Sequence, residues 1–268
     1  KDGTAPVNHF FVWIEQVIAA NLDKLFPDMT IMESYPFRVT RDADSTIQEL
    51  EAADLLETME QSVRQRRFGS VIRVTVNHAM PSQLRELLIE NLEMDRRDIY
   101  TLEGPRGVNG LINLHAIDRF DLKDPQLKQK IPAQLSINSH ETNLFSTIRK
   151  GDILLHHPYD SFKPVIDFLY TAARDPDVLA IKQTLYRVGK NSPVVQALLE
   201  AREHGKQVAV LVELKARFDE ESNISWARML EKEGVHVIYG LLGLKTHSKI
   251  ALVVRKEGEH IRRYIHLA

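Results

Sequence analysis

Cysteine is absent from the 268 residues of this chain, so disulfides, thiolate metal sites and thiol nucleophiles are excluded. The chain also lacks a basic excess, because 35 Lys and Arg residues stand against 37 Asp and Glu residues, for a net charge of −2. Proteins that coat duplex nucleic acid usually carry such an excess. We therefore expect no nucleic-acid partner, and any anion site must be a local cluster of cations.

Long apolar runs are missing as well. Stretches such as Phe10–Ile14, Val208–Val212 and Ile250–Val254 fall far short of the roughly 18–20 residues that cross a bilayer. The first residues form no signal peptide and lack an initiator methionine, and the last ones, Arg262–Ala268, stop directly after a strand-like pattern. We expect a fragment of a longer protein, with about two domains for this length.

The first half of the chain mixes helix and strand signals without a repeating unit. Ser45 and Gln48 form a capping box for an amphipathic helix that reaches Val63. The other predicted elements are helices over Phe10–Leu25, Gln83–Leu92 and Leu111–Phe120 and strands over Thr30–Thr40 and Val71–Val76. This mixture predicts an α+β domain.

A different rhythm begins after the polar segment Asp121–Gln134, which contains two prolines and is the expected linker. Apolar strands and amphipathic helices then alternate, which is typical of a right-handed parallel α/β sheet covered on both faces. The predicted order is strand Val178–Tyr186, a helix from Pro193 that ends near Gly205, strand Val208–Leu214, helix Glu220–Glu233 and strand Val235–Tyr239.

Three side chains capable of anion binding or catalysis follow these strands at equal spacing. Arg187, Arg217 and His247 are each 30 residues apart, which is one strand-plus-helix unit. In an open parallel sheet they would emerge at the carboxyl edge, where ligands bind. Lys182 and Lys215 lie close by. Because guanidinium groups match phosphate oxygens bidentately, the sequence predicts a site for a polyanionic phosphate compound.

The residues around His247 support this prediction. If the segment Gly243–Lys249 is extended, Lys245, His247 and Lys249 point the same way. Two nearby ammonium groups disfavour protonation of the imidazole, so we expect a neutral, nucleophilic ring. The same groups would offset charge on an incoming phosphoryl group. A histidine so placed can accept a phosphoryl group covalently and pass it on.

Each of these residues also has an ordinary structural explanation. A lone His-x-Lys is a weak motif, and Arg187 or Arg217 alone would more often form a surface ion pair, for example with Glu213, Asp219 or Glu220. The joint pattern at three strand ends is what favours the phosphate site.

At these residues the chain resembles the polyphosphate kinase family, and the resemblance extends over essentially all 268 residues. The specific segments occur in order and are well separated. They are residues Phe37–Asp44, Leu154–Tyr159 with Phe162, Ala180–Val188, Val212–Glu220 and Gly243–Lys249.

The resemblance implies that residues 1–133 are the later part of an α+β head domain. Residues 134–268 would be the first part of a catalytic domain with a phospholipase D-like α/β fold, built on a mainly parallel sheet. The signature of that fold is His-x-Lys-x4-Asp. This chain has His247 and Lys249, but Val254 stands where the aspartate would be, which disfavours phosphodiester hydrolysis and fits a phosphotransferase.

The resemblance also implies roles for the site residues. His247 would be the histidine that becomes phosphorylated, assisted by Lys245 and Lys249, and Arg187 and Arg217 match two arginines associated with a magnesium–phosphate site. Arginine is always protonated and has no acceptor. We therefore expect it to contact phosphate oxygens that Mg²⁺ bridges.

The expected enzyme reversibly transfers the terminal phosphate of ATP to inorganic polyphosphate, releasing ADP, with Mg²⁺ as cofactor. The resemblance implies a cytoplasmic homo-oligomer that can associate peripherally with a membrane. It also implies that these residues alone are inactive, because a second catalytic domain is missing. Two other interpretations stay open: a phospholipase D-like phosphodiesterase that uses the same histidine, and a non-catalytic polyanion-binding module.

Overall fold

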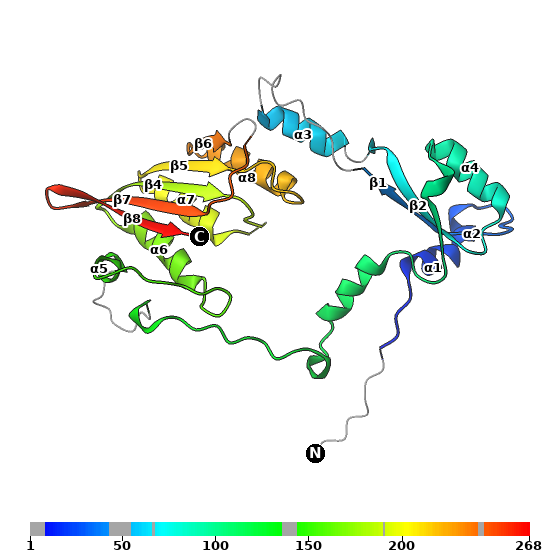
Figure 1. Cartoon of the computed structure of the whole chain (residues 1–268), viewed down its shortest axis with the longest axis horizontal. Helices are drawn as coiled ribbons and strands as arrows, with labels where there is room; N and C mark the ends of the chain where they lie inside the picture. The colour runs from blue at the N-terminus through cyan, green and yellow to red at the C-terminus, as the bar shows by residue number, and fades with distance from the viewer. Residues whose placement is uncertain (1–8, 43–54, 66–67, 136–143, 190, 241–243) are drawn as a thin grey trace, which may run out of the picture. The chain divides into compact units, whose positions relative to one another are not determined.

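The computed structural model describes residues 9–42, 55–65, 68–135, 144–189, 191–240 and 244–268, which Figure 1 traces in colour. The chain divides into two compact units, residues 1–45 with 66–124 and residues 46–65 with 125–268. The division between 124 and 125 lies inside the segment predicted as a linker. The family boundary at 133 and 134 stays a prediction.

The first unit is built on a three-stranded sheet of order β1-β2-β3. Its helices and strands are α1 (Ile14–Ala19), α2 (Leu22–Leu25), β1 (Phe37–Arg41), β2 (Val71–Asn77), α4 (Ser82–Leu92) and β3 (Ile99–Leu102). β1 pairs antiparallel with β2, and β2 pairs in parallel with β3 through the crossover helix α4. Leu84 and Leu88 of α4 pack on the buried Val74 and Val76 of β2.

Local side chains explain where this unit departs from the prediction. The helix predicted over Phe10–Leu25 is split into α1 and α2, where the Asn21 amide donates to the Val17 carbonyl at 2.8 Å. The first strand begins only after Pro36, which has no N–H for a sheet. Residues 108–116 form a 3₁₀ segment rather than an α-helix. The predicted capping box, Ser45 and Gln48, lies outside the described residues.

The second unit is built on a five-stranded sheet of order β6-β5-β4-β7-β8. Its helices and strands are α3 (Leu55–Gln65), α5 (Leu144–Arg149), α6 (Lys163–Arg174), β4 (Val178–Leu185), α7 (Pro193–Glu203), β5 (Gln207–Val212), α8 (Glu220–Lys232), β6 (His236–Tyr239), β7 (Ile250–Glu257) and β8 (His260–Leu267). The helices and strands predicted between residues 178 and 239 are confirmed within a few residues at their ends.

One face of this sheet carries the core. Val208, Val210 and Val212 of β5 are buried, whereas the residues between them are only half-buried. The buried face packs against α6, α7 and α8. Met59 of α3, 1% exposed, belongs to the same core. The described residues therefore cover one face of the sheet, where the sequence predicted cover on both.

The predicted mainly parallel sheet is wrong, because the sheet is mixed. β4, β5 and β6 run parallel through the crossovers α7 and α8, but β7 pairs antiparallel with β4, and β8 pairs antiparallel with β7. The connection from β6 to β7, residues 240–249, is shorter than the dozen or so residues of a crossover. The chain therefore starts β7 at the edge where β6 ended, and β8 follows through a hairpin with Gly258 at φ 62°.

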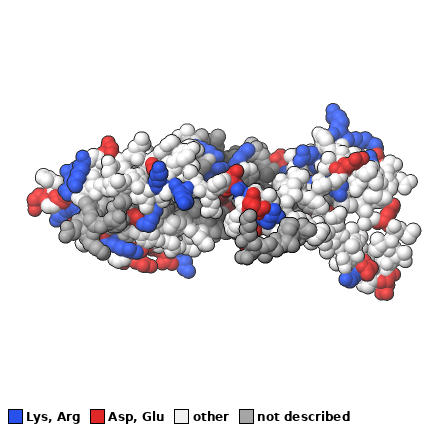
Figure 2. Space-filling model, turned by 90° about the horizontal axis from the view of Figure 1, so that it is seen from below, with Lys and Arg blue, Asp and Glu red and all other residues white. Residues whose placement is uncertain are grey.

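Charge is dispersed over the surface visible in Figure 2, where Lys and Arg side chains are interspersed with Asp and Glu side chains. No helix in the described part of the chain combines the length and apolar character needed to cross a membrane.

Candidate functional site

Arg187, Arg217 and His247 lie at one edge of the five-stranded sheet. Arg187 follows β4, Arg217 follows β5 and His247 precedes β7. Because β4 runs parallel to β5 and antiparallel to β7, the carboxyl ends of the first two and the amino end of the third share that edge. The expected shared edge is thus observed, although His247 reaches it at the start of an antiparallel strand and Arg217 contacts Arg187 through its backbone carbonyl.

Four of the side chains at this edge lie close to the ring of Tyr186. The His247 ring lies edge-on to it, with centroids 5.0 Å apart and planes at 73°. Lys249 Nζ lies 4.2 Å from the Tyr186 centroid, Arg187 Cζ 5.5 Å and Lys245 Nζ 5.9 Å. Lys245, His247 and Lys249 therefore approach one ring, in agreement with the predicted alternation. Three cations and one imidazole surround a single aromatic side chain.

Arg187 already has a partner in this structure. Its Nε lies 3.1 Å from Asp219 Oδ2, and its Nη2 donates to the Arg217 carbonyl at 3.2 Å. The Arg187 and Asp219 side chains are 52% and 30% exposed, so the pair is accessible to a competing anion. The surface ion pair considered from the sequence is present, with Asp219 as the partner.

Helix α8 holds the segment that carries Arg187. The Asn223 amide donates to the Tyr186 carbonyl at 2.7 Å, and Trp226 Nε1 donates to the Gly189 carbonyl at 2.7 Å. These bonds fix the backbone on both sides of Arg187. Trp226 is 7% exposed and also lies in the core.

The two remaining predicted lysines occupy different places. Lys182 lies in the middle of β4, is exposed, and points to the face opposite the buried Ile181. It does not line the cavity described below. Lys215 Nζ donates to the Leu244 carbonyl at 2.9 Å, so its ammonium group holds the backbone of the segment that leads to His247.

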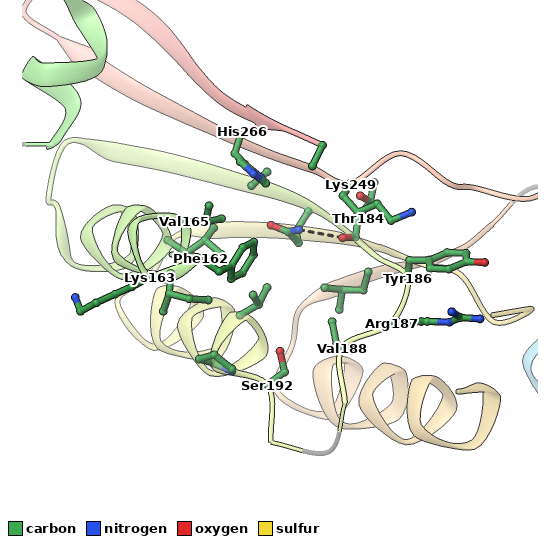
Figure 3. A pocket seen from close by; sticks show the side chains of 18 of the residues that line it. Phe162, Lys163, Val165, Thr184, Tyr186, Arg187, Val188, Ser192, Lys249 and His266 are labelled. Atoms are coloured by element: carbon green, nitrogen blue, oxygen red, sulfur yellow. Dashed lines mark hydrogen bonds between the residues drawn. The ribbon is translucent and has the colours of Figure 1, made fainter. Parts of the chain in front are cut away.

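A cavity of about 690 Å³ opens at this edge and extends beneath the sheet. Figure 3 shows Tyr186, Arg187 and Lys249 at one end of it and Phe162, Val165 and His266 toward the other. Its mouth is therefore cationic, whereas the interior is mostly apolar. The His247 side chain is exposed and lines the mouth.

His266 is a cavity residue that the sequence analysis did not single out. It is half-buried on β8, and its ring lies 6.3 Å from that of Phe162. Burial, with a smaller contribution from nearby His157, lowers the pKa of His266. Its signal in the sequence was the alternation of β8, which places it on the same face as the buried Tyr264.

Magnesium does not fit these residues as direct ligands. The described part of the chain contains no cluster of three or more His, Asp or Glu residues that could hold a metal ion. The charged groups at the mouth, Arg187, Lys245 and Lys249, are cations that suit phosphate oxygens. A magnesium ion at this edge would therefore have to arrive with the phosphates of a nucleotide.

Two family models together cover most of the chain. The family model "Polyphosphate kinase middle domain" matches residues 4–114, and "Polyphosphate kinase C-terminal domain 1" matches residues 143–268. Polyphosphate kinase 1 of Chlorobaculum tepidum is 55% identical over 265 residues, which are 99% of this chain and 38% of that relative. Polyphosphate kinase of Prosthecochloris aestuarii is 54% identical over 256 residues, 96% of this chain and 36% of the relative.

A solved structure is similar over most of the chain. The crystal structure of polyphosphate kinase from Porphyromonas gingivalis matches with a TM-score of 0.67 and 28% sequence identity, over 93% of this chain and 34% of that one. This chain therefore spans little more than a third of the length of the relatives it matches.

Proposed function

This chain belongs to the polyphosphate kinase family, and from that premise we propose that a full-length protein containing it transfers the terminal phosphate of ATP to inorganic polyphosphate. Residues 1–133 would be the later part of its head domain, and residues 134–268 the first part of a phospholipase D-like catalytic domain. The substrates would be MgATP and polyphosphate, in a cytoplasmic homo-oligomer that can associate peripherally with a membrane.

One observation carries the proposal: an exposed imidazole lies at the mouth of a cavity among three cations grouped around Tyr186. An imidazole nitrogen has a free electron pair and is a competent nucleophile toward phosphorus, whereas an ammonium group has no free electron pair. His247 is therefore the proposed acceptor of the phosphoryl group.

The reaction would proceed in two transfers. An imidazole nitrogen of His247 attacks the γ-phosphorus of ATP, an N–P bond forms, and the bond to the bridging oxygen breaks so that its electron pair leaves with ADP. A terminal oxygen of polyphosphate then attacks the phosphohistidine, and the N–P bond breaks. Arg187, Arg217, Lys245 and Lys249 would offset the negative charge that develops on the phosphoryl oxygens.

The test is covalent labelling of the full-length protein with γ-labelled MgATP, quenched under basic conditions that preserve a phosphoramidate. We expect an acid-labile label on His247 that chases into ADP or polyphosphate. His247→Ala and His247→Gln should both abolish labelling and synthesis, because neither side chain can carry the phosphoryl group. His260→Ala is the matched control, because His260 is exposed at the start of β8, at the opposite edge of the sheet.

The other two interpretations make different predictions in the same assay. A phosphodiesterase would cleave lipid or nucleic-acid phosphodiesters and would not make polymer, and Val254 on β7 argues against it. A polyanion-binding module would bind polyphosphate equally well with and without His247 and would take no label. Polymer synthesis by His247→Ala at an appreciable rate would demote His247 to a phosphate-binding residue.

A further inference from the structure

The backbone of residues 244–248, which contains His247, is hydrogen-bonded by side chains of other segments. Lys215 Nζ donates to the Leu244 carbonyl at 2.9 Å, and the Thr246 amide donates to Glu213 Oε2 at 2.6 Å. Thr184 Oγ1 donates to the Ser248 carbonyl at 2.8 Å. The three bonds fall on alternate residues. In an extended chain the backbone groups of alternate residues face the same side, so the bonds form a ladder along one side.

His247 lies between two rungs of this ladder. Its neighbours Thr246 and Ser248 are each bonded through the backbone, to Glu213 after β5 and to Thr184 on β4. Thr184 Oγ1 also accepts from the Ile250 amide at 2.8 Å, which fixes the start of β7. The backbone on both sides of His247 is therefore held by Glu213, which directly follows β5, and by Thr184 on β4.

Glu213 is the most constrained member of the ladder. It is 1% exposed, and both of its carboxylate oxygens are used, since Oε1 accepts from the Lys215 amide at 3.0 Å and Oε2 from Thr246. Its own carbonyl accepts from Asn223 at 2.9 Å, and Asn223 is fully buried. A buried carboxylate is costly unless it is hydrogen-bonded, and bonds to an ionised acceptor are the strong ones. A charge held in this way favours a single geometry of the loop.

From these contacts we propose that Glu213 is a positioning residue for His247, which acts through the Thr246 amide, with Thr184 as the second anchor. The inference rests on the proposed function, because positioning matters only if His247 attacks phosphorus. Displacement of a reacting group by about 1 Å can cost up to ~10²-fold in rate. Loss of either anchor should therefore reduce the rate of the phosphoryl transfer more than it reduces ATP binding.

The test is the single-turnover rate of His247 labelling by MgATP in the full-length protein. Glu213→Gln keeps the size of the side chain but turns one acceptor into an amide donor that faces an N–H. We expect labelling to be slowed at least ~10-fold, with the KM for ATP within ~3-fold of the unmodified protein. Leu198→Ala is the matched control, because Leu198 is buried on α7 and its loss should lower the melting temperature without touching the ladder.

A second pair of variants separates positioning from general destabilisation. Thr184→Ser keeps the hydroxyl and should label close to normally, whereas Thr184→Val should be slowed like Glu213→Gln. This pair decides the question if Glu213→Gln does not accumulate as folded protein. Glu213→Gln or Thr184→Val that label no more slowly than Leu198→Ala would overturn the inference and leave the proposed function standing. An unmodified protein that takes no label would overturn both.

Discussion

Substitution of Arg187 distinguishes most clearly between two roles of its side chain, a surface ion pair and a phosphate ligand. Its contact with Asp219 is 3.1 Å long, between side chains that are 52% and 30% exposed. Exposed pairs of this kind contribute about 0.2–1 kcal/mol. Arg187→Ala should therefore lower the free energy of unfolding by less than about 1 kcal/mol. If the guanidinium also stabilises the transferring phosphoryl group, the same change should slow labelling of His247 by about 10²-fold, or about 2.7 kcal/mol.

Asp219→Asn provides the decisive comparison, because it breaks the ion pair and leaves the guanidinium in place. We expect labelling by this variant to stay within a few-fold of normal. Arg187→Lys should recover only part of the rate, since an ammonium lacks the fork geometry. The assay is single-turnover labelling in parallel with thermal unfolding of each full-length variant. Equal slowing in Asp219→Asn and Arg187→Ala, or near-normal labelling in Arg187→Ala, would refute the phosphate role.

Three further outcomes are expected. Burial lowers the pKa of His266. The contribution of the neutral His266 ring to folding stability is therefore complete above about pH 6.5 and is lost as the pH falls through the pKa of the folded state. His266→Gln should flatten the dependence of melting temperature on pH in this window. Arg255 Nε lies 3.0 Å from Asp175 Oδ2, and the two side chains are only 14% and 9% exposed. Arg255→Met would leave the Asp175 carboxylate buried without its partner and should destabilise the second unit by about 3–5 kcal/mol. Hydrogen exchange in β4 and β7 measures this loss. Purified residues 1–268 should make no sustained polymer from MgATP, and continued synthesis would show that they contain all essential ATP-binding residues.

The elements that the sequence predicted well carry strong local signals. α7 begins at Pro193 directly after Ser192, and α8 begins in the acidic run at Glu220, as predicted. The fixed φ of Pro suits the first helical position, and acidic residues in the first turn interact favourably with the helix dipole. Both effects depend only on residues that are close in the sequence. The direction of β7 could not be predicted in this way, because pairing between β4 and β7 depends on residues far apart in the sequence.

The candidate site shows the same limit. The equal spacing of Arg187, Arg217 and His247 indicated a shared edge, and this holds because Arg187 and Arg217 follow successive parallel strands while His247 lies in the connection from β6 to β7 at the same edge. The roles of Glu213 and Lys215 were not visible. Glu213 was considered as an ion-pair partner for the arginines, but it binds the Thr246 amide instead. Bonds from a side chain to a distant backbone depend on how the loops meet in three dimensions, and no local pattern records them.

The central place of β4 in the sheet has a consequence for the order in which the protein folds. β4 pairs with β5 after one helix, but it pairs with β7 only after both α7 and α8 and the whole of β6. The second loop is more than twice as long, and each doubling adds only about 0.6 kcal/mol of closure entropy. The longer loop therefore affects the rate at which β4 and β7 pair more than it affects the stability of the pair, because contacts between residues distant in the sequence form slowly. During synthesis β4 and β5, which Arg187 and Arg217 follow, can pair before the segment with His247 emerges, so the site would be completed only when β7 docks on β4.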